Sequence, residues 1–278
     1  MIADVELSYR EWPGAGEPLV VLHGMLGSSR NWATVAKDLA DAGRRVVVPD
    51  ARNHGGSPHA PEMDYADLAG DVVELLDRLK IERATAIGHS MGGKTAMLLA
   101  CRHPGRVSRL IVVDIAPKNY RWVGHRHEFA AMNDLDLANL QSRAEAEMRM
   151  ESRVPDWGLR KFLTTNLERT DTGWRWIVNL PAVTAALPFL EKNPLGPADR
   201  YAGPTLFIVG GKSNYVQPQA DLPDILAHFP QARLTVMANS GHNPHFDARE
   251  DFVRTVLPGP GSSRTRLPPS PPASCPLP

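Results

Sequence analysis

Residues 84–104, which read ATAIGHSMGGKTAMLLACRHP, constrain the fold more than any other part of the sequence. Residues 84–87 form a short apolar run, which is typical of a buried strand in a parallel sheet. Residues 91–102 contain no helix breaker other than two early glycines, and Pro104 ends the segment. The sequence therefore predicts a strand, a sharp turn at Ser90 and a helix.

Two motifs overlap at this turn. Residues 88–92, GHSMG, fit G-x-S-x-G, in which small flanking residues let the backbone turn tightly and expose a nucleophilic serine. Residues 88–95, GHSMGGKT, also fit G-x-x-x-x-G-K-[ST], the phosphate-binding loop of nucleotide hydrolases. The apolar run 110–113 and Asp114 resemble the strand that carries a metal-binding carboxylate in those enzymes. Both motifs require a preceding strand and a following helix, so the choice depends on the partners that the rest of the chain supplies.

Strands and helices alternate on both sides of this segment. Apolar runs bounded by turn residues predict strands, and apolar residues at helical spacing predict the helices between them. An alternating stretch at 4–10 predicts a half-exposed strand that forms a hairpin with 19–22, and a last helix is expected at 244–257. We therefore expect a mostly parallel sheet with helices on both faces and the functional site at the carboxyl ends of the strands. The other predicted strands are 46–48, 84–87, 107–113, 205–209 and 233–237.

The alternation stops at 117–202, which divides the chain. Helical stretches and four of the six tryptophans lie there, and we expect these tryptophans to fill a small core of the insertion, with some of them also facing a ligand. The predicted organisation is an α/β core made of 1–116 and 203–257, interrupted by this mostly helical insertion. Residues 258–278 hold eight prolines and four serines, a composition that predicts disorder. The four tryptophans are Trp122, Trp157, Trp174 and Trp176.

Composition limits the classes of partner. The chain has 31 Lys plus Arg and 31 Asp plus Glu, so we expect no basic face for nucleic acid or anionic lipid. The N-terminal sequence MIADVELSYREW lacks the apolar region of a secretory signal, and we expect no transmembrane span. Cys101 and Cys275 make no disulfide framework, which fits a reducing compartment. We therefore expect a cytoplasmic protein that binds a small molecule.

A serine nucleophile needs a base and an oxyanion site. A serine hydroxyl reacts poorly at neutral pH unless an imidazole takes its proton and a carboxylate holds that imidazole. His242 follows the last predicted strand in a Ser-Gly-His turn and is the predicted base, with His245 as the fallback. Residues 23–27, HGMLG, follow the first parallel strand, so we expect the N–H groups of Met25 and Met91 to form the oxyanion hole.

These partners favour the serine interpretation of the central motif. A phosphate-binding loop would leave HGMLG and the Gly-His turn without a role, whereas a serine nucleophile uses both. Lys94 is then interpreted as an ordinary residue of the first helical turns. The pairs His125 with His127 and His242 with His245 lack a third ligand at a telling spacing, so we expect no metal site and no cofactor.

Six segments together resemble the α/β-hydrolase superfamily, and within it the YbfF-type esterases. The resemblance covers nearly the whole chain. It implies an α/β-hydrolase fold with a helical cap at 117–202, inserted after the strand that ends at Asp114. It also implies hydrolysis of esters of modest acyl length, with thioesters as a further class. The segments are HGMLGS at 23–28, DARNHGGSP at 50–58, GHSMGGKTAM at 88–97, VVDIAPKNY at 112–120, GGKSNYV at 210–216 and Gly-His at 241–242.

The catalytic acid departs from the wider superfamily. Its usual place is three residues after the glycine that ends the penultimate strand, and here Gly210 leads to Ser213. The resemblance to YbfF-type esterases places the acid at Asp114 instead. We expect Asp114 to orient His242 and Ser213 to hydrogen-bond in the same network. The alternative for Asp114 is to cap the turn before Pro117.

The predicted function is a serine carboxylic-ester hydrolase that acts through an acyl-enzyme on short to medium acyl esters. Two other classes of function use the same sequence features. An acyltransferase or amidase would use the same site, and a non-catalytic α/β-hydrolase scaffold would serve as a receptor for a small molecule. An intact Ser90 and His242 argue against the receptor.

Overall fold

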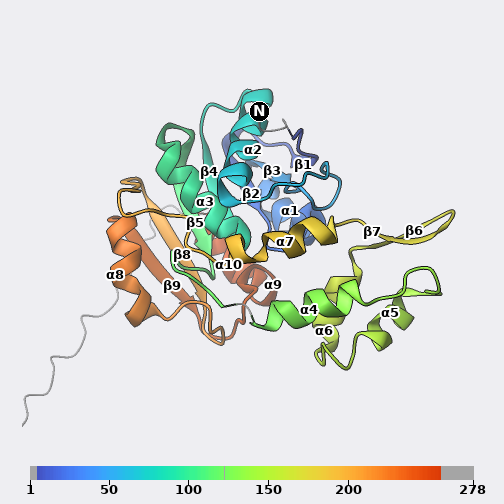
Figure 1. The fold of residues 1–278 in the computed structure, drawn as a ribbon. Coiled ribbons are helices and arrows are strands. Elements are labelled where there is room, and N and C mark those ends of the chain that lie inside the picture. Colours follow the sequence, from blue (N-terminus) through green and yellow to red (C-terminus); the bar gives the residue numbers. More distant parts are fainter. Residues whose placement is uncertain (1–4, 122, 258–278) are drawn as a thin grey trace, which may run out of the picture.

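A computed structural model describes residues 5–121 and 123–257, which form a seven-stranded sheet flanked by helices (Figure 1). The strand order is β1-β3-β2-β4-β5-β8-β9, and every neighbouring pair is parallel except β1 and β3. The predicted fold class is confirmed. The strands are β1 (Tyr9–Trp12), β2 (Gly16–Leu22), β3 (Arg44–Pro49), β4 (Ala84–His89), β5 (Val107–Val113), β8 (Thr205–Gly210) and β9 (Ala232–Met237).

The predicted N-terminal hairpin is wrong. β1 begins at Tyr9 and pairs antiparallel with β3, with Tyr9 opposite Pro49, while β2 lies on the other side of β3. Both edges of β2 are taken by β3 and β4, so the N-terminal strand closes the free edge of β3 instead. Val5 and Leu7 precede β1 and are buried in the core, which explains their apolar alternation without a strand at 4–10.

Helices cover both faces of the sheet (Figure 1). Val46 and Val48 of β3 pack with α1 (Ala33–Asp41) and α10 (Arg249–Val256) on one face. Val47 points to the other face, which packs against α2 (Tyr65–Arg78), α3 (Met91–Arg102) and α8 (Pro218–His228). This alternation follows from the two-residue period of a strand and explains why the central strands are apolar throughout. Two short 3-10 helices, Ser29–Trp32 and Pro104–Arg106, precede α1 and β5.

The described residues between β5 and β8 add no strand to the central sheet. They form four helices and a two-stranded antiparallel sheet of β6 and β7 that the sequence did not predict, because each strand is only four residues long and mostly half-buried. Trp174 and Trp176 pack against a small cluster around Leu135 and Leu167, as expected, whereas Trp157 is 58% exposed. The elements are α4 (Val123–Asn133), α5 (Arg143–Arg149), α6 (Trp157–Thr164), β6 (Leu167–Thr170), β7 (Gly173–Trp176) and α7 (Leu180–Leu190).

The C-terminal helix is divided in two. α9 (Pro244–Asp247) and α10 are separated by Ala248, whose φ of −134° and ψ of 51° are not helical. The disorder predicted for 258–278 lies outside the described residues, as does Trp122. Within the described ranges, every helix is too short or too polar to cross a membrane.

Candidate active site

Ser90 occupies the turn between β4 and α3 in a strained conformation. Its φ is 52° and its ψ is −117°, a region that costs a non-glycine residue about 1–3 kcal/mol. The turn is held on both sides: the Ser90 N–H donates to the carbonyl of Val113 at 3.1 Å, and its own carbonyl accepts from Gly93 and Lys94. Such strain is typical of functional sites, because only a surrounding structure that fixes the backbone can maintain it.

The glycines of G-x-S-x-G allow the strand and the helix to approach. A Cβ atom on Gly88 would lie 2.1 Å from the carbonyl oxygen of Gly92. A Cβ atom on Gly92 would lie 2.3 Å from the carbonyl oxygen of Leu22 in β2. Both contacts are far below van der Waals distance, so no larger residue fits at these two positions and the turn that carries Ser90 requires glycine at both.

Asp114 and His242 come together from distant parts of the chain. His242 Nδ1 lies 2.8 Å from Oδ2 of Asp114, which follows β5 and is fully buried. The Gly210 N–H donates to Oδ1 at 2.9 Å, and the Ser213 hydroxyl donates to Oδ2. These donors offset the desolvation of a buried carboxylate. Among the described residues, the Asp114 carboxylate is therefore directed to β8, the following loop and His242, away from the turn before Pro117.

The loop of His242 is tied to the serine turn. His89 directly precedes Ser90, and its Nε2 donates to the backbone carbonyl of His242 at 2.8 Å. Burial lowers the pKa of His89 well below its usual value, so the ring is neutral. The two imidazole rings lie 4.7 Å apart between centroids. The loop that carries His242 is thus anchored to the residue that precedes Ser90.

His245, the fallback base, is placed in a different environment. Its ring stacks on Trp32 with centroids 4.0 Å apart and an interplanar angle of 5°. Burial lowers the pKa of His245 to about 3. Its Nδ1 has no hydrogen-bond partner among the described residues, whereas Nδ1 of His242 contacts Asp114. The geometry therefore favours His242 as the base.

The HGMLG loop lies against the serine. A Cβ atom on Gly24 would lie 2.8 Å from Nδ1 of His89 and 3.4 Å from Cβ of Ser90. Met25 follows Gly24 and Met91 follows Ser90, and both side chains are buried. Leu26 has a φ of 59°, so this loop, like the serine turn, holds a strained backbone. The backbone of Gly24, which precedes Met25, thus lies beside Ser90, which Met91 directly follows.

Two buried histidines that the sequence analysis did not single out hold this loop. His54 Nε2 accepts the Leu26 N–H at 3.2 Å, and His23 Nε2 accepts the Ala51 N–H at 2.9 Å. Their Nδ1 atoms lie 2.9 Å and 2.8 Å from the carbonyls of Arg52 and Gly24. An amide can only donate, so Nε2 is unprotonated in both rings. Burial lowers the pKa of His54 to about 3 and also lowers that of His23.

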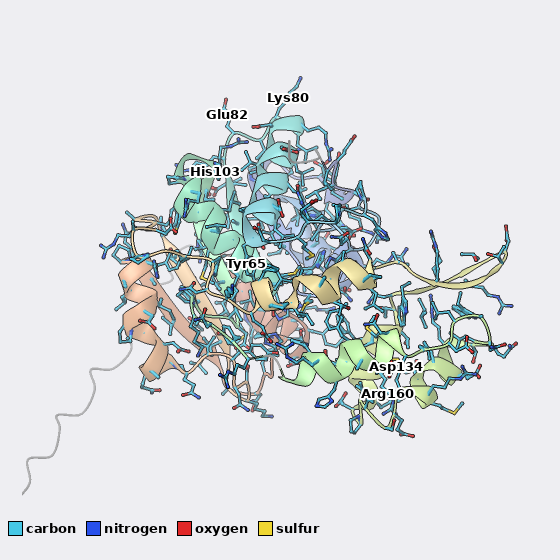
Figure 2. All side chains as sticks on the ribbon, viewed as in Figure 1. Tyr65, Lys80, Glu82, His103, Asp134 and Arg160 are labelled. Atoms are coloured by element: carbon cyan, nitrogen blue, oxygen red, sulfur yellow. The ribbon has the colours of Figure 1, made fainter. Side chains whose placement is uncertain are left out.

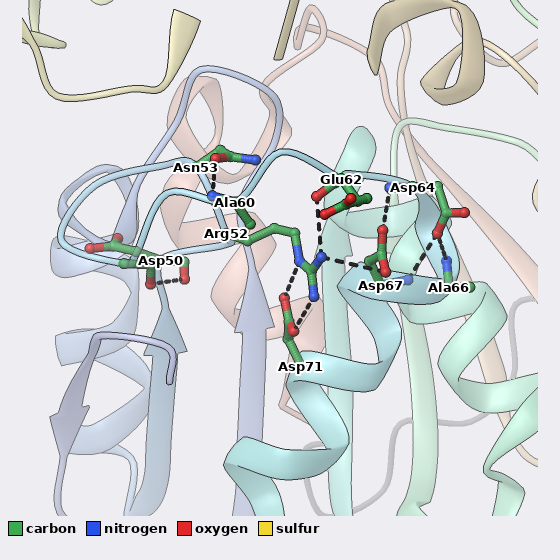
Figure 3. Close-up of polar contacts among 10 residues, drawn as sticks. Asp50, Arg52, Asn53, Ala60, Glu62, Asp64, Ala66, Asp67 and Asp71 are labelled. Carbon is green, nitrogen blue, oxygen red and sulfur yellow. Dashed lines mark hydrogen bonds and ion pairs between the residues drawn. The ribbon is translucent and has the colours of Figure 1, made fainter. Parts of the chain in front are cut away.

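A buried ion pair anchors the loop that carries His54 (Figure 3). Arg52 Nε and Nη2 donate to the two carboxylate oxygens of Asp71 in α2 at 2.7 and 2.6 Å. The same guanidinium contacts the carbonyl of Glu62 at 3.1 Å and the carboxylate of Asp67 at 3.4 Å. Burial raises the pKa of Asp71, and the pairing with Arg52 opposes that shift. The bidentate geometry fixes the Arg52 backbone, whose carbonyl orients His54.

The interpretation of Lys94 as an ordinary helical residue is wrong. Its side chain is fully buried, and Nζ donates to the carbonyls of 190–192 at the end of α7, at 3.2, 3.2 and 2.6 Å. Nζ also lies 5.5 Å and 4.9 Å from the ring centroids of Tyr65 and Tyr120. Burial lowers the pKa of Lys94 to about 7. The Lys94 side chain therefore joins α3 to α7. Separately, the described residues contain no cluster of side chains suited to a metal ion.

The comparisons with known proteins agree with this architecture. A family model described as the alpha/beta hydrolase fold matches residues 17–249. The sn-1-specific diacylglycerol lipase ABHD11 of Mus musculus is 41% identical over 246 residues, which are 86% of this chain and 79% of that protein. Esterase YbfF of Escherichia coli strain K12 is 37% identical over 242 residues, covering 86% of this chain and 91% of that protein.

A solved structure shows the same arrangement of elements. A marine microorganism esterase superposes with a TM-score of 0.87 and 35% identity, covering 91% of this chain and 98% of that one. The overlap therefore spans nearly the whole of both chains.

Proposed function

The chain belongs to the α/β-hydrolase fold family and is a carboxylesterase, and we propose that it cleaves its ester through an acyl-enzyme formed on Ser90. His242 is the general base in this proposal, and Asp114 holds its imidazole. Ser213 supports Asp114 from the position that carries the acid elsewhere in the superfamily. The N–H groups of Met25 and Met91 bind the oxyanion.

The carboxylate–imidazole contact sets the proton positions that this mechanism needs. An ionised carboxylate only accepts hydrogen bonds, so Nδ1 of His242 carries the proton that faces Asp114. Nε2 then accepts the proton of the Ser90 hydroxyl as the oxygen attacks the ester carbonyl. The same proton passes to the departing alcohol, and a water molecule, activated by His242, hydrolyses the acyl-enzyme.

The oxyanion of each tetrahedral intermediate would lie between two turns. Met91 begins α3, and the positive end of a helix dipole favours negative charge there. The Gly24 backbone lies beside Ser90, and the N–H of the next residue, Met25, is the second donor in this proposal. One such donor is worth about 10²–10³ in kcat in other serine hydrolases.

The single observation that carries the proposal is the buried Asp114 carboxylate within 2.8 Å of a histidine whose loop is bonded to the serine turn. A receptor would not need this combination of a strained serine, a buried acid and an imidazole that contacts the acid. The esterase and lipase names of the relatives indicate carboxylic esters as the substrate class.

We further propose that 117–202 forms a helical cap over the site. Tyr215 OH on the loop after β8 lies 3.2 Å from Nε2 of His125 in α4, which joins the segment to the surroundings of His242. Lys94 and Tyr65 bind the carbonyls at the end of α7, and Tyr65 is labelled where α2 meets α7 in Figure 2. A cap joined at both ends would limit the acyl chain to short and medium lengths, and thioesters of those acids are a further candidate class.

A substrate panel tests the proposal. The purified chain is given p-nitrophenyl esters of two to sixteen carbons, acyl-CoA thioesters and acyl anilides, with and without added ethanol as acyl acceptor. We expect hydrolysis of short and medium esters, with the highest kcat/KM below about ten carbons. Preferential formation of ethyl esters would indicate an acyltransferase, and preference for anilides an amidase. Binding without turnover of any of these compounds would contradict the proposal.

A further inference from the structure

Tyr215 lies flat against the imidazole of His242. The two ring centroids are 3.7 Å apart and the planes differ by 15°. Tyr215 comes from the same loop as Ser213, and its N–H donates to the Ser213 hydroxyl oxygen at 3.2 Å. Two neutral aromatic rings prefer offset or edge-to-face arrangements, whereas a cation is attracted to the face of a tyrosine ring. The stack therefore suits the imidazolium form of His242 better than the neutral form.

The hydroxyl of Tyr215 connects this stack to α4. Tyr215 OH lies 3.2 Å from Nε2 of His125, and Nδ1 of His125 lies 2.7 Å from the carboxylate of Glu128 one turn along the helix. A carboxylate only accepts, so Nδ1 carries a proton and the other ring nitrogen, Nε2, faces the tyrosine hydroxyl. Burial raises the pKa of Tyr215 to about 12, so its hydroxyl keeps the proton that it donates.

The backbone of Tyr215 is held independently of its side chain. The hydroxyl of Tyr120 donates to the Tyr215 carbonyl at 2.9 Å and accepts the N–H of Ala116 at 2.9 Å. The ring orientation is thus fixed by the stack and by the bond to His125, whereas the position of the loop is fixed by Tyr120 and Ser213. A change at Glu128 or His125 can therefore alter the ring without displacing the loop.

We propose that Glu128, His125 and Tyr215 form a positioning relay that stabilises the imidazolium of His242 in the transition state. Donation from Tyr215 to His125, reinforced by Glu128, shifts electron density onto the phenol oxygen and makes the ring face more negative. The imidazolium exists only after His242 has taken the proton of Ser90, so the relay lowers the barrier without strengthening substrate binding. The inference rests on the proposed serine esterase mechanism and adds to it residues from α4.

Single variants of the full chain give the first test, measured with p-nitrophenyl butyrate. Tyr215→Leu removes the ring, and we expect kcat to fall about tenfold with KM unchanged within about twofold. Tyr215→Phe keeps the ring but not the donor, so its loss in kcat should be smaller, about threefold relative to the wild type. Glu128→Gln keeps the shape and removes the charge, with a similar loss of about threefold.

A double-mutant cycle distinguishes the relay from separate structural effects. If Glu128 acts through the Tyr215 hydroxyl, Glu128→Gln should have no further effect in the Tyr215→Phe background, so the double variant also loses about threefold. Asp134→Asn is the matched control, since this exposed carboxylate follows α4, pairs with Arg153 and is labelled in Figure 2. We expect Asp134→Asn to leave kcat unchanged in both backgrounds.

The outcomes separate this inference from the proposed function. The relay would be overturned if the two losses in kcat multiplied, giving about ninefold in the double variant, or if the substitutions raised KM instead of lowering kcat. An active wild type would still support the esterase proposal. A wild type without turnover on the ester panel, or an active Ser90→Ala variant, would instead overturn the mechanism on which the relay rests.

Discussion

Three residues at the site share an unusual backbone. Ser90, Asp114 and Leu26 have φ values of 52°, 51° and 59°, in a region that side chains rarely adopt. Each lies where a strand of the sheet has ended and a functional group must turn toward the others. Contacts such as Ser90 N–H to Val113 and Asp114 N–H to Ile208 hold these turns. The strain indicates that the site is preorganised, because the surrounding sheet sets its geometry before substrate arrives.

The acid at Asp114 leads to the first prediction. Asp114→Asn keeps the shape of the side chain but removes the charge that stabilises the imidazolium, so kcat should fall by up to ~10⁴-fold, as in other triads. Ser213→Ala removes one neutral donor to Asp114, and a roughly tenfold loss is expected. Initial rates with a p-nitrophenyl ester measure both effects, and thermal melting shows whether each variant folds.

A catalytic role for another carboxylate would contradict this prediction. Asp221 is bound by Lys118 at 2.6 Å and Asp247 accepts the Gly241 N–H at 2.7 Å, so neither is expected to serve as the acid. If Asp114→Asn retained near-normal activity while Asp221→Asn or Asp247→Asn abolished it, the acid would be misplaced and Ser213 would lose its proposed role.

At the scale of elements, the site depends on connections between loops. The loop at 50–57 holds the HGMLG loop through His23, His54 and Asp50, whose carboxylate accepts the N–H groups of Ser29 and Gly56. The ion pair of Arg52 with Asp71 joins this loop to α2. Buried, neutral histidines therefore support the HGMLG loop, and acid should weaken that support.

Acid stability provides the second prediction. The pKa of His54 is about 3 in the folded chain and near 6.5 when unfolded, so the unfolded state binds more protons between these values. Its contribution to stability is complete above pH 6.5 and is lost as the pH falls, by about 1.4 kcal/mol per pH unit between roughly pH 6 and 4. His54→Gln should therefore flatten the dependence of the unfolding free energy on pH in that range.

Urea unfolding at several pH values measures this slope. His59→Gln is the matched control, because the His59 side chain is exposed and its variant should keep the wild-type slope. An unchanged slope in His54→Gln would show that His54 is not the buried neutral histidine that the structure describes.

The third prediction concerns the joint between α3 and α7. Lys94→Met removes the buried ammonium donor shared by the carbonyls of 190–192, so the free energy of unfolding should fall by about 1–3 kcal/mol. Lys37→Met is the control, since Lys37 is an exposed residue of α1 that pairs with Asp41. Surface changes of this kind usually stay within about 0.5 kcal/mol. Equal stability of the two variants would mean that Lys94 does not hold α7.

For the whole molecule, the sequence predicted the layers, the central strands and the meeting of Asp114, Ser213 and His242. The layers and the central strands follow from periodicity and motifs, which are local in sequence, and the meeting of these three residues follows from the resemblance to a known family. The β1–β3 pairing, the buried Lys94 and the histidine supports at 23 and 54 were missed, because each depends on a contact between segments far apart in the chain. Tyr215 was missed for the same reason: its partner His125 lies 90 residues away.

The measurement that tests the account most directly is the site of covalent labelling by a fluorophosphonate. We expect intact mass spectrometry to show one adduct per chain and peptide mapping to place it on Ser90, with loss of esterase activity in parallel. Ser90→Ala should take up no label, should still fold and should lose about a million-fold in kcat. An adduct on another residue, or a Ser90→Ala variant that turns over esters at the wild-type rate, would contradict the account.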